Sequence, residues 1–276
     1  MSKIAYDPVK DRFASQIRHA RFLRSIFYRL LDLFFLRGWY VRSILRKLWR
    51  EKFSKRDQLK LLDAGCGFGQ YDSFILRSFS NVQVKSVDVK EDYLNDCRRY
   101  FKNDIDKGRI RFDNADLLEF HQDSEYDAIV CVDVLEHIDD DVRVMTNMAN
   151  SLKKGGYFIM HSPSDLAGKD AGEDEFFVEE HARAGYSKEE LDKKLRKAGF
   201  DSAQIRYTYG SFGHAGWVIL IKYPMLWLTR AGLVILPALC LYYLITLLPG
   251  LLLLRLDMMR ENETGAGICA LAKKES

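Results

Sequence analysis

The chain has 276 residues, of which 47% are hydrophobic, and a formal net charge of +3. This composition supports a sizeable buried core and excludes a disordered chain. No CxxC pair occurs among the five scattered cysteines, so we expect a reducing compartment, no disulfide framework and no metal site. The first residues, MSKIAYDPVKDRF, lack the apolar core and cleavage site of a signal peptide, and we expect the catalytic part to stay in the cytoplasm.

Residues 9–56 are strongly basic, with 14 Lys/Arg against 3 Asp/Glu. Large apolar residues recur there at helical spacing, opposite to arginines. The apolar positions are Leu23, Phe27, Leu30 and Phe34 in one stretch and Val41, Ile44, Leu45 and Leu48 in the next. We predict two amphipathic helices, over 13–36 and after Gly38, in a basic arm that spans residues 1–58. This pattern favours an anionic membrane surface over nucleic acid.

From Leu59 onward, short apolar runs alternate with helical patterns. The runs are LKLLDA, VQVKSVDV, RIRF, YDAIVCVDV and GGYFIMHS. Such alternation predicts an α/β fold with a mostly parallel sheet and helices on both faces. A helix capped by Ser187 and Glu190 follows, and two more strand patterns, SAQIRYTYG and GAGICALAKK, come after it.

The first strand pattern runs into a glycine-rich turn, DAGCGFG, at residues 63–69. Glycines between a strand and a helix allow the backbone to approach a ligand closely. The second strand pattern ends at Asp88, which is suitably placed to accept hydrogen bonds from ribose hydroxyls. A dinucleotide dehydrogenase would need glycine at position 70, where this chain has Gln70, so the GxGxG spacing argues against that class.

These residues resemble the first motif of class I S-adenosylmethionine (SAM)-dependent methyltransferases. Three later stretches resemble further motifs of that family in the same order, especially in its small-molecule enzymes of the ubiquinone and menaquinone type. They are Asn114–Leu117, Asp133–Ile138 and Leu152–Gly156. The resemblance covers residues 59–210. It implies SAM as cofactor and a Rossmann-like seven-stranded, mostly parallel sheet whose strands six and seven are antiparallel.

The same resemblance implies a set of cofactor-binding residues. They are Asp63, Gly65, Gly67, Gly69, Asp88, Asp116, Leu117 and Asp133. The glycines would contact the methionine part of SAM, Asp63 would order their loop, and Asp88 would bind the ribose. Asp116 and Leu117 would contact the adenine. The alternatives are that Asp116 only caps a helix and that Leu117 belongs to the core.

Candidate catalytic residues lie near the ends of strands four and five. His137, His181 and Glu136 fall where open α/β proteins bind ligands, and a histidine can accept a proton near neutral pH. His161 is a further candidate. Methyl transfer mainly needs close, dry positioning of the reactants, so a base is optional, and each of these residues has a purely structural alternative. The segment 176–187, FFVEEHARAGYS, is expected to form an acceptor lid.

Residues 231–254 form an uncharged apolar run, long enough for the ~30 Å hydrocarbon core of a bilayer. The strand patterns on either side, at 203–210 and 265–273, would pair in one sheet. A single crossing is therefore excluded, because it would leave the last strand on the opposite side of the membrane. Residues 211–264 are instead expected to be an insertion that leaves the sheet and returns to it.

We predict that this insertion is a re-entrant or interfacial helical hairpin. Pro237 and Pro249-Gly250 would break the apolar run, and Arg230 and Arg255 would hold its ends near lipid head groups. The alternative is that the apolar segments pack on each other or form a dimer interface.

These patterns support one leading hypothesis. The chain would be a methyltransferase at the cytoplasmic face of a membrane, acting on a lipid-like small molecule, with no nucleic acid partner. The alternatives are a methyltransferase of a soluble small molecule or RNA, and a non-catalytic SAM-binding membrane adaptor. The expected parts are the arm at 1–58, the SAM-binding core at 59–210, the insertion at 211–264, and the last strand with its tail at 265–276.

Overall fold

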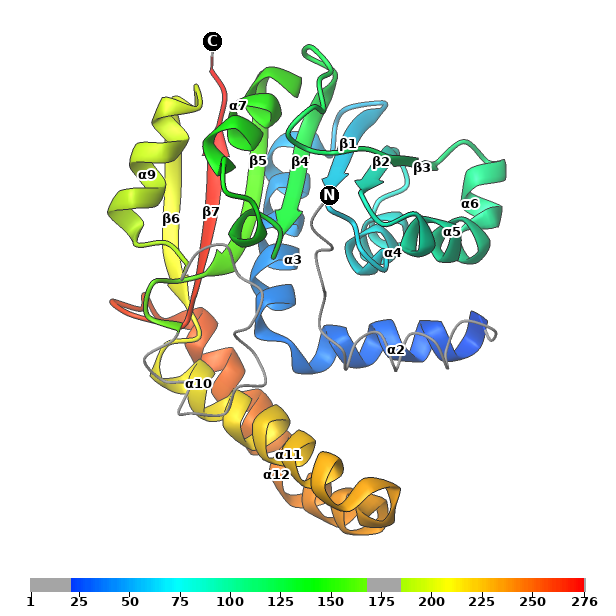
Figure 1. The fold of residues 1–276 in the computed structure, drawn as a ribbon, viewed down its shortest axis with the longest axis vertical. Coiled ribbons are helices and arrows are strands. Elements are labelled where there is room, and N and C mark those ends of the chain that lie inside the picture. The colour runs from blue at the N-terminus through cyan, green and yellow to red at the C-terminus, as the bar shows by residue number, and fades with distance from the viewer. Residues whose placement is uncertain (1–20, 168–184, 276) are drawn as a thin grey trace.

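A computed structural model of the protein describes residues 21–167 and 185–275. Its centre is a seven-stranded sheet with the order β3-β2-β1-β4-β5-β7-β6 (Figure 1). The strands are β1 (Leu59–Ala64), β2 (Val82–Asp88), β3 (Ile110–Asn114), β4 (Tyr126–Val132), β5 (Leu152–Pro163), β6 (Ser202–Thr208) and β7 (Gly267–Lys273). Only β7 runs antiparallel to its neighbours, β5 and β6. This confirms the predicted α/β class and the antiparallel last pair.

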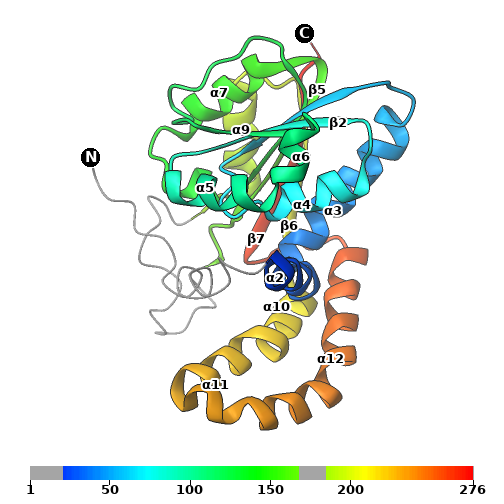
Figure 2. The same ribbon diagram turned by 90° about the vertical axis from the view of Figure 1, so that its right-hand side faces the viewer.

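Helices cover both faces of the sheet (Figures 1 and 2). Those that follow the first five strands are α4 (Gln70–Ser78), α5 (Glu91–Tyr100), α6 (Lys102–Asp106), η2 (Leu135–His137), α7 (Asp141–Ser151) and α9 (Lys188–Lys197). Side chains of α7 and α9 share one buried cluster with the sheet, and side chains of α4 and α5 share the cluster on the other face. The predicted cap of α9 is present, because Ser187 Oγ accepts a hydrogen bond from Glu190 N at 3.1 Å.

The N-terminal arm forms α2 (Arg21–Phe34), α3 (Leu36–Leu48) and a short π-helix, η1 (Trp49–Phe53). The predicted break at Gly38 is wrong. The chain bends at Phe35, whose backbone is extended, and Gly38 lies inside α3, where the Arg42 guanidinium packs so close that a Cβ would lie 3.2 Å from it. The apolar face of α3 packs on the sheet, and Val41 is fully buried there.

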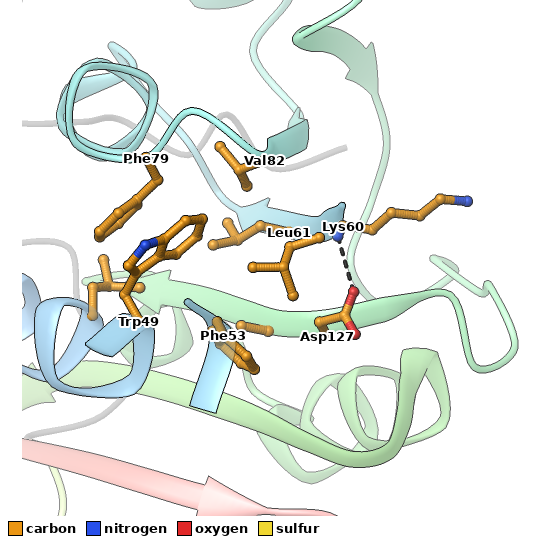
Figure 3. Close-up of a pocket in the computed structure, with 10 residues that line it drawn as sticks. Trp49, Phe53, Lys60, Leu61, Phe79, Val82 and Asp127 are labelled. Atoms are coloured by element: carbon orange, nitrogen blue, oxygen red, sulfur yellow. Dashed lines mark hydrogen bonds between the residues drawn. The ribbon is translucent and has the colours of Figure 1, made fainter. Parts of the chain in front are cut away.

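A small cavity of about 10 Å³ lies where η1 packs on the start of β1 (Figure 3). The Trp49 and Phe79 rings stack beside it with their centroids 4.0 Å apart. Lys60 N donates to Asp127 Oδ2 at 2.9 Å at its edge. A space of that size has room for about one water molecule, and it lies at the end of β1 opposite to the glycine turn. It is a packing defect of the core and not a ligand site.

The insertion between β6 and β7 is a helical hairpin that projects from the sheet (Figure 2). Its elements are α10 (Ser211–Trp217), η3 (Val218–Lys222), α11 (Tyr223–Ala231), η4 (Gly232–Ile235) and α12 (Leu236–Met259). The chain reverses at Gly232, whose φ of +63° suits glycine. By length and apolar composition the stretch Ser211–Met259 passes as a candidate membrane span, and 6% of its most apolar window is buried.

The predicted break at Pro249-Gly250 is wrong, because α12 runs through it, whereas Pro237 lies where η4 gives way to α12. Pro237 lies in the first turn of α12, where a missing N–H loses no helical hydrogen bond. Pro249 lies in the interior. Gly250 next to it allows the two limbs to approach closely, since a Cβ there would lie 2.5 Å from Leu220 Cγ. The packing between the limbs therefore continues past the proline.

The root of the hairpin is fastened to α3 by a buried carboxylate. Asp257 Oδ1 accepts a hydrogen bond from Gly213 N at 3.0 Å, and its Oδ2 accepts one from the Tyr40 hydroxyl at 2.7 Å. Leu36, Leu220 and Leu254 pack around this contact as a separate buried cluster. The arm and both limbs of the hairpin therefore meet at one point.

Candidate cofactor and acceptor site

The glycine turn after β1 has the backbone that its sequence predicts. Gly65, Gly67 and Gly69 have φ of +82°, +50° and +74°, a region that other residues rarely adopt. A Cβ at Gly65 would lie 2.3 Å from Val134, and one at Gly69 would lie 2.8 Å from Phe101, so these two glycines are required by packing. A Cβ at Gly67 would meet nothing within 4 Å. The backbone at Gly67 therefore borders open space in which a ligand can lie.

Asp88 at the end of β2 is tied to this turn. Its Oδ2 accepts a hydrogen bond from Gly67 N at 2.9 Å, and its Oδ1 accepts one from Lys90 N at 2.9 Å. The side chain is 6% exposed, and burial raises the pKa of its carboxyl. Each carboxylate oxygen keeps a free lone pair, so Asp88 can still accept hydrogen bonds from a diol.

A second carboxyl, Asp72 in the first turn of α4, lies against Asp63 beneath the turn. Ser86 Oγ donates to Asp72 Oδ1 at 2.8 Å, whereas Asp63 Oδ2 and Asp72 Oδ2 are buried without a hydrogen-bond partner. Burial raises both pKa values, that of Asp72 to about 7 and that of Asp63 well above its usual range. A proton on one carboxyl would supply the donor that this buried pair otherwise lacks. The sequence analysis missed Asp72.

The segment after β3 lies beside Asp88, because Ala115 N donates to Asp88 O at 3.2 Å. Asp116 is exposed, and its Oδ1 accepts a hydrogen bond from Leu118 N at 2.9 Å in a turn rather than at a helix start. Leu117 is 4% exposed and belongs to a core cluster. Asp116 therefore has free access to a ligand, and the adenine contacts of both residues stay predictions.

A chain of polar contacts crosses the carboxyl ends of β4, β5 and β6. Asp133, whose φ is +54°, forms an ion pair with Arg37. The distance from Arg37 Nη1 to Asp133 Oδ2 is 2.8 Å. His161 Nδ1 lies 3.1 Å from Asp133 Oδ1, and His161 Nε2 lies 3.0 Å from Thr208 Oγ1. The His161 side chain is 4% exposed and that of Asp133 is 25% exposed. Of these two groups, Asp133 is the one that a ligand can reach.

The other predicted catalytic residues are placed differently. Glu136 is 1% exposed and accepts a hydrogen bond from Ser162 Oγ at 2.9 Å. Burial and the nearby Asp133 charge raise the pKa of Glu136 to about 8, so it is largely protonated at neutral pH. His137 lies half-buried in η2 beside it. His181 and most of the expected lid at 176–187 lie outside the described residues.

The arm supplies residues that the sequence analysis did not assign to the site. Arg24 Nη2 donates to the carbonyl oxygen of Phe68, in the glycine turn, at 2.8 Å, and the Tyr28 hydroxyl donates to the same oxygen. Arg37 of α3 pairs with Asp133. These side chains lie on the polar sides of their helices, which a pattern alone assigns to solvent. α2 therefore covers the cofactor turn from outside.

The fold and this site together define a class I SAM-dependent methyltransferase domain. Residues 55–204 match a family described as methyltransferase domain, and the chain belongs to that family. The predicted cofactor class is thereby confirmed, and SAM supplies an electrophilic methyl group on a sulfonium when bound. The residues fit SAM, because open space borders Gly67. Asp88, which can accept hydrogen bonds from a diol, is hydrogen-bonded to the Gly67 backbone N–H.

Curated relatives are distant. The chain is 26% identical over 113 residues to a ubiquinone biosynthesis O-methyltransferase of Hydrogenovibrio crunogenus, covering 41% of this chain and 46% of that protein. It is 31% identical over 98 residues to the methyltransferase GfsG of Streptomyces halstedii, covering 35% of each. The matches thus span about half or less of the length of these relatives.

Solved structures share the fold. A phosphoethanolamine N-methyltransferase of Haemonchus contortus in complex with SAM superimposes with a TM-score of 0.58 at 16% identity, over 91% of this chain and 60% of that one. A sarcosine dimethylglycine methyltransferase from Galdieria sulphuraria gives a TM-score of 0.54 at 15% identity, over 86% and 84%. At such identities the likeness concerns the fold alone.

Replacing Gly67 by alanine should weaken SAM binding by at least about tenfold, because the added methyl group enters the space beside the turn. Gly108→Ala is a matched control, since Gly108 has φ of +67° and its Cβ would also meet nothing within 4 Å. Both substitutions carry a similar backbone cost of roughly 1 kcal/mol. Calorimetric titration with SAM compares them, and equal affinities in the two variants would contradict the placement of the cofactor.

The carboxyl pair makes stability depend on pH. With the pKa of Asp72 raised to about 7, the folded protein holds a proton that the unfolded chain releases above about pH 4. The associated stability is complete at low pH and is lost as the pH rises through 7. Asp72→Asn keeps a neutral partner for Asp63 at every pH. When the pH is raised from about 5 to about 8, the unfolding free energy of the variant should fall by about 2 kcal/mol less than that of the wild type.

Urea unfolding at the two pH values, without SAM, measures this difference. Asp92→Asn, an exposed carboxyl on α5, is the control and should follow the wild type. If Asp72→Asn also follows the wild type, the pair holds no proton in the folded state.

Proposed function

We propose that this protein methylates a lipid-like small molecule that it takes from a membrane, with the hairpin entering the lipid and the sheet staying on the cytoplasmic side. The observation that carries the proposal is the position of the hairpin beside the acceptor end of the sheet. Thr208 bonds to His161, and α10 starts at Ser211. An acceptor that leaves the lipid along the hairpin would arrive next to Asp133.

The hairpin surface supports this reading. Along α12, exposed leucines recur every three or four residues and so form one stripe. They are Leu241, Leu244, Leu248 and Leu252, which are 62%, 80%, 77% and 59% exposed. Leu233 and Val234 at the tip are 74% and 88% exposed. Soluble monomers rarely carry a continuous apolar surface of this length, and a bilayer would cover it.

α2 supplies a second apolar surface at the root of the hairpin. Phe34 at the end of α2 contacts Tyr243 of α12 with ring centroids 5.6 Å apart, and α2 extends away from there, below α4 and α5 in Figure 1. The outward side of α2 carries Phe22, which is 74% exposed, and Leu30, which is 47% exposed. A helix in this position would lie in the plane of the membrane interface while the hairpin enters the lipid.

In this proposal the polar chain at the sheet edge orients the acceptor. His161, held by Thr208, fixes one oxygen of Asp133, and Arg37 pairs with the other. The partly exposed carboxylate would accept a hydrogen bond, and then the proton, from an acceptor hydroxyl or amine as it is methylated. Since transfer mainly requires a close and dry approach, the covering α2 would contribute by excluding water.

Introducing glutamates into the stripe should separate docking from cofactor binding. We expect Leu244→Glu/Leu248→Glu to leave SAM affinity unchanged, because α12 extends away from the sheet and from the glycine turn (Figure 1). The variant should stay in the supernatant when the wild type sediments with vesicles. Transfer of labelled methyl groups into the organic phase of a membrane extract should fall at least about tenfold.

Lys193→Glu/Lys197→Glu, which adds two exposed glutamates to α9, is the control and should behave as the wild type does. Undiminished sedimentation of the leucine variant would contradict the docking. Label that the wild type transfers only to water-soluble products would contradict a lipid-like acceptor.

A further inference from the structure

A second feature of the surface is a basic hollow of about 820 Å³ between α2, α3, α4 and α12. Six arginines line it: Arg29, Arg42, Arg46, Arg50, Arg77 and Arg255. Lys47 adds a seventh cation, and Asp32 is the only acid in the lining, so the formal balance is 7 − 1 = +6. None of these residues belongs to the glycine turn or to the chain around Asp133. The hollow is therefore separate from the cofactor and acceptor site.

Asp32 is already engaged and leaves most of this charge uncompensated. It pairs with the guanidinium of Arg42 and, at 3.3 Å, with Arg77. Burial lowers the pKa of Arg42, and the neighbouring Arg46 and Arg77 lower it further, which shows that the cations repel one another. Within the described part of the chain, Arg46 and Arg255 have no carboxylate within ion-pair distance. Cations held together at this density favour an anion between them.

The surroundings of the hollow indicate which anion it takes. Leu33, Trp39, Phe74 and Met258 also line it, so its walls are apolar as well as basic. Arg255 lies on α12 at the position that continues the exposed stripe of Leu244, Leu248 and Leu252 toward the root. The hollow therefore begins where the apolar stripe ends. In an anionic lipid the charged phosphate lies next to the apolar acyl chains, which matches a basic hollow next to an apolar stripe. Arginine binds phosphate through two parallel hydrogen bonds.

We propose that this hollow binds the phosphate of an anionic membrane lipid and so fixes the depth and orientation of the protein on the bilayer. The assignment rests on the proposed membrane function, and it adds a defined lipid chemistry to it. With a phosphate seated at Arg46 and Arg255, α2 lies at the interface and the stripe of α12 extends into the lipid. Free phosphate has the same head chemistry but would not use the adjoining stripe.

Full-length protein with vesicles of phosphatidylcholine, alone or mixed with phosphatidylglycerol, tests this. Arg46→Gln/Arg255→Gln removes two exposed cations of the hollow and leaves the Asp32 pairs in place. A cation near an anionic surface contributes ~1 kcal/mol, so the variant should bind the mixed vesicles about 30-fold more weakly than the wild type. Binding to phosphatidylcholine alone and SAM affinity should not change. Lys193→Gln/Arg196→Gln on α9 is the matched control.

Three outcomes would overturn the assignment, and a fourth would overturn the proposed membrane function. Equal binding of the variant and the wild type to mixed vesicles would show that the hollow does not meet the lipid phosphate. Loss of the wild type's preference for phosphatidylglycerol in millimolar inorganic phosphate would identify a site for free phosphate. Loss of binding to all vesicles by the wild type would contradict the proposed membrane function itself, whereas binding without lipid preference would contradict this inference alone.

Discussion

The antiparallel pairing of β6 with β7 is the constraint on which the other features depend. It places both ends of the hairpin at one edge of the sheet, from the pair Thr208 and Gly267 onward. The apolar limbs must then leave together and return together. Asp257 fastens this root to Tyr40 of α3, and the same helix carries Arg37 to Asp133. One buried carboxylate thus connects the surface that we assign to lipid with the end of the sheet where the acceptor is expected.

The root of the hairpin is closely packed. At Gly213 a Cβ would lie 2.7 Å from Leu36 and 2.8 Å from the Asp257 carboxyl carbon. The neighbouring Arg37 N donates to the Tyr209 hydroxyl at 3.1 Å. Movement of the hairpin relative to α3 would break these contacts together. We therefore expect the root of the hairpin to move together with α3, and in the proposed function this would hold the acceptor end of the sheet at a constant angle to the membrane.

Much of the fold was predictable from the sequence. Apolar residues alternate along strands and recur every three or four residues along helices, and this periodicity depends only on which side of each element is buried. The glycine turn and Asp88 were equally predictable, since their spacing follows from the strand-to-helix connection. The helix ends were not. Phe35 bends the arm and Pro249 does not break α12, although the residue types suggest otherwise, and next to Pro249 the close approach of Gly250 to Leu220 is visible only in the folded chain.

The residues that the pattern missed share one property. Arg24, Arg37 and Asp72 are polar side chains on helix sides that a periodicity assigns to solvent. Each is largely covered in the folded chain only because a distant segment packs over it: α5 over Arg24, the β4 end over Arg37 and β1 over Asp72. A periodicity pattern cannot predict contacts between residues far apart in the sequence, such as Arg37 and Asp133. The sequence analysis also treated the apolar faces of the two arm helices alike. In the structure the apolar face of α3 packs on the sheet, whereas much of that of α2 is exposed.

The central claim is that the hairpin enters lipid, and Cys240 on α12 allows a direct test without substitution. It is the one exposed cysteine, since Cys66, Cys97, Cys131 and Cys269 are buried. An environment-sensitive fluorophore attached to Cys240 reports whether this part of the hairpin meets water or acyl chains. On addition of vesicles we predict a blue shift, quenching by lipids that carry a quencher on the acyl chain, and protection from iodide. An unchanged spectrum with undiminished iodide quenching would contradict the account.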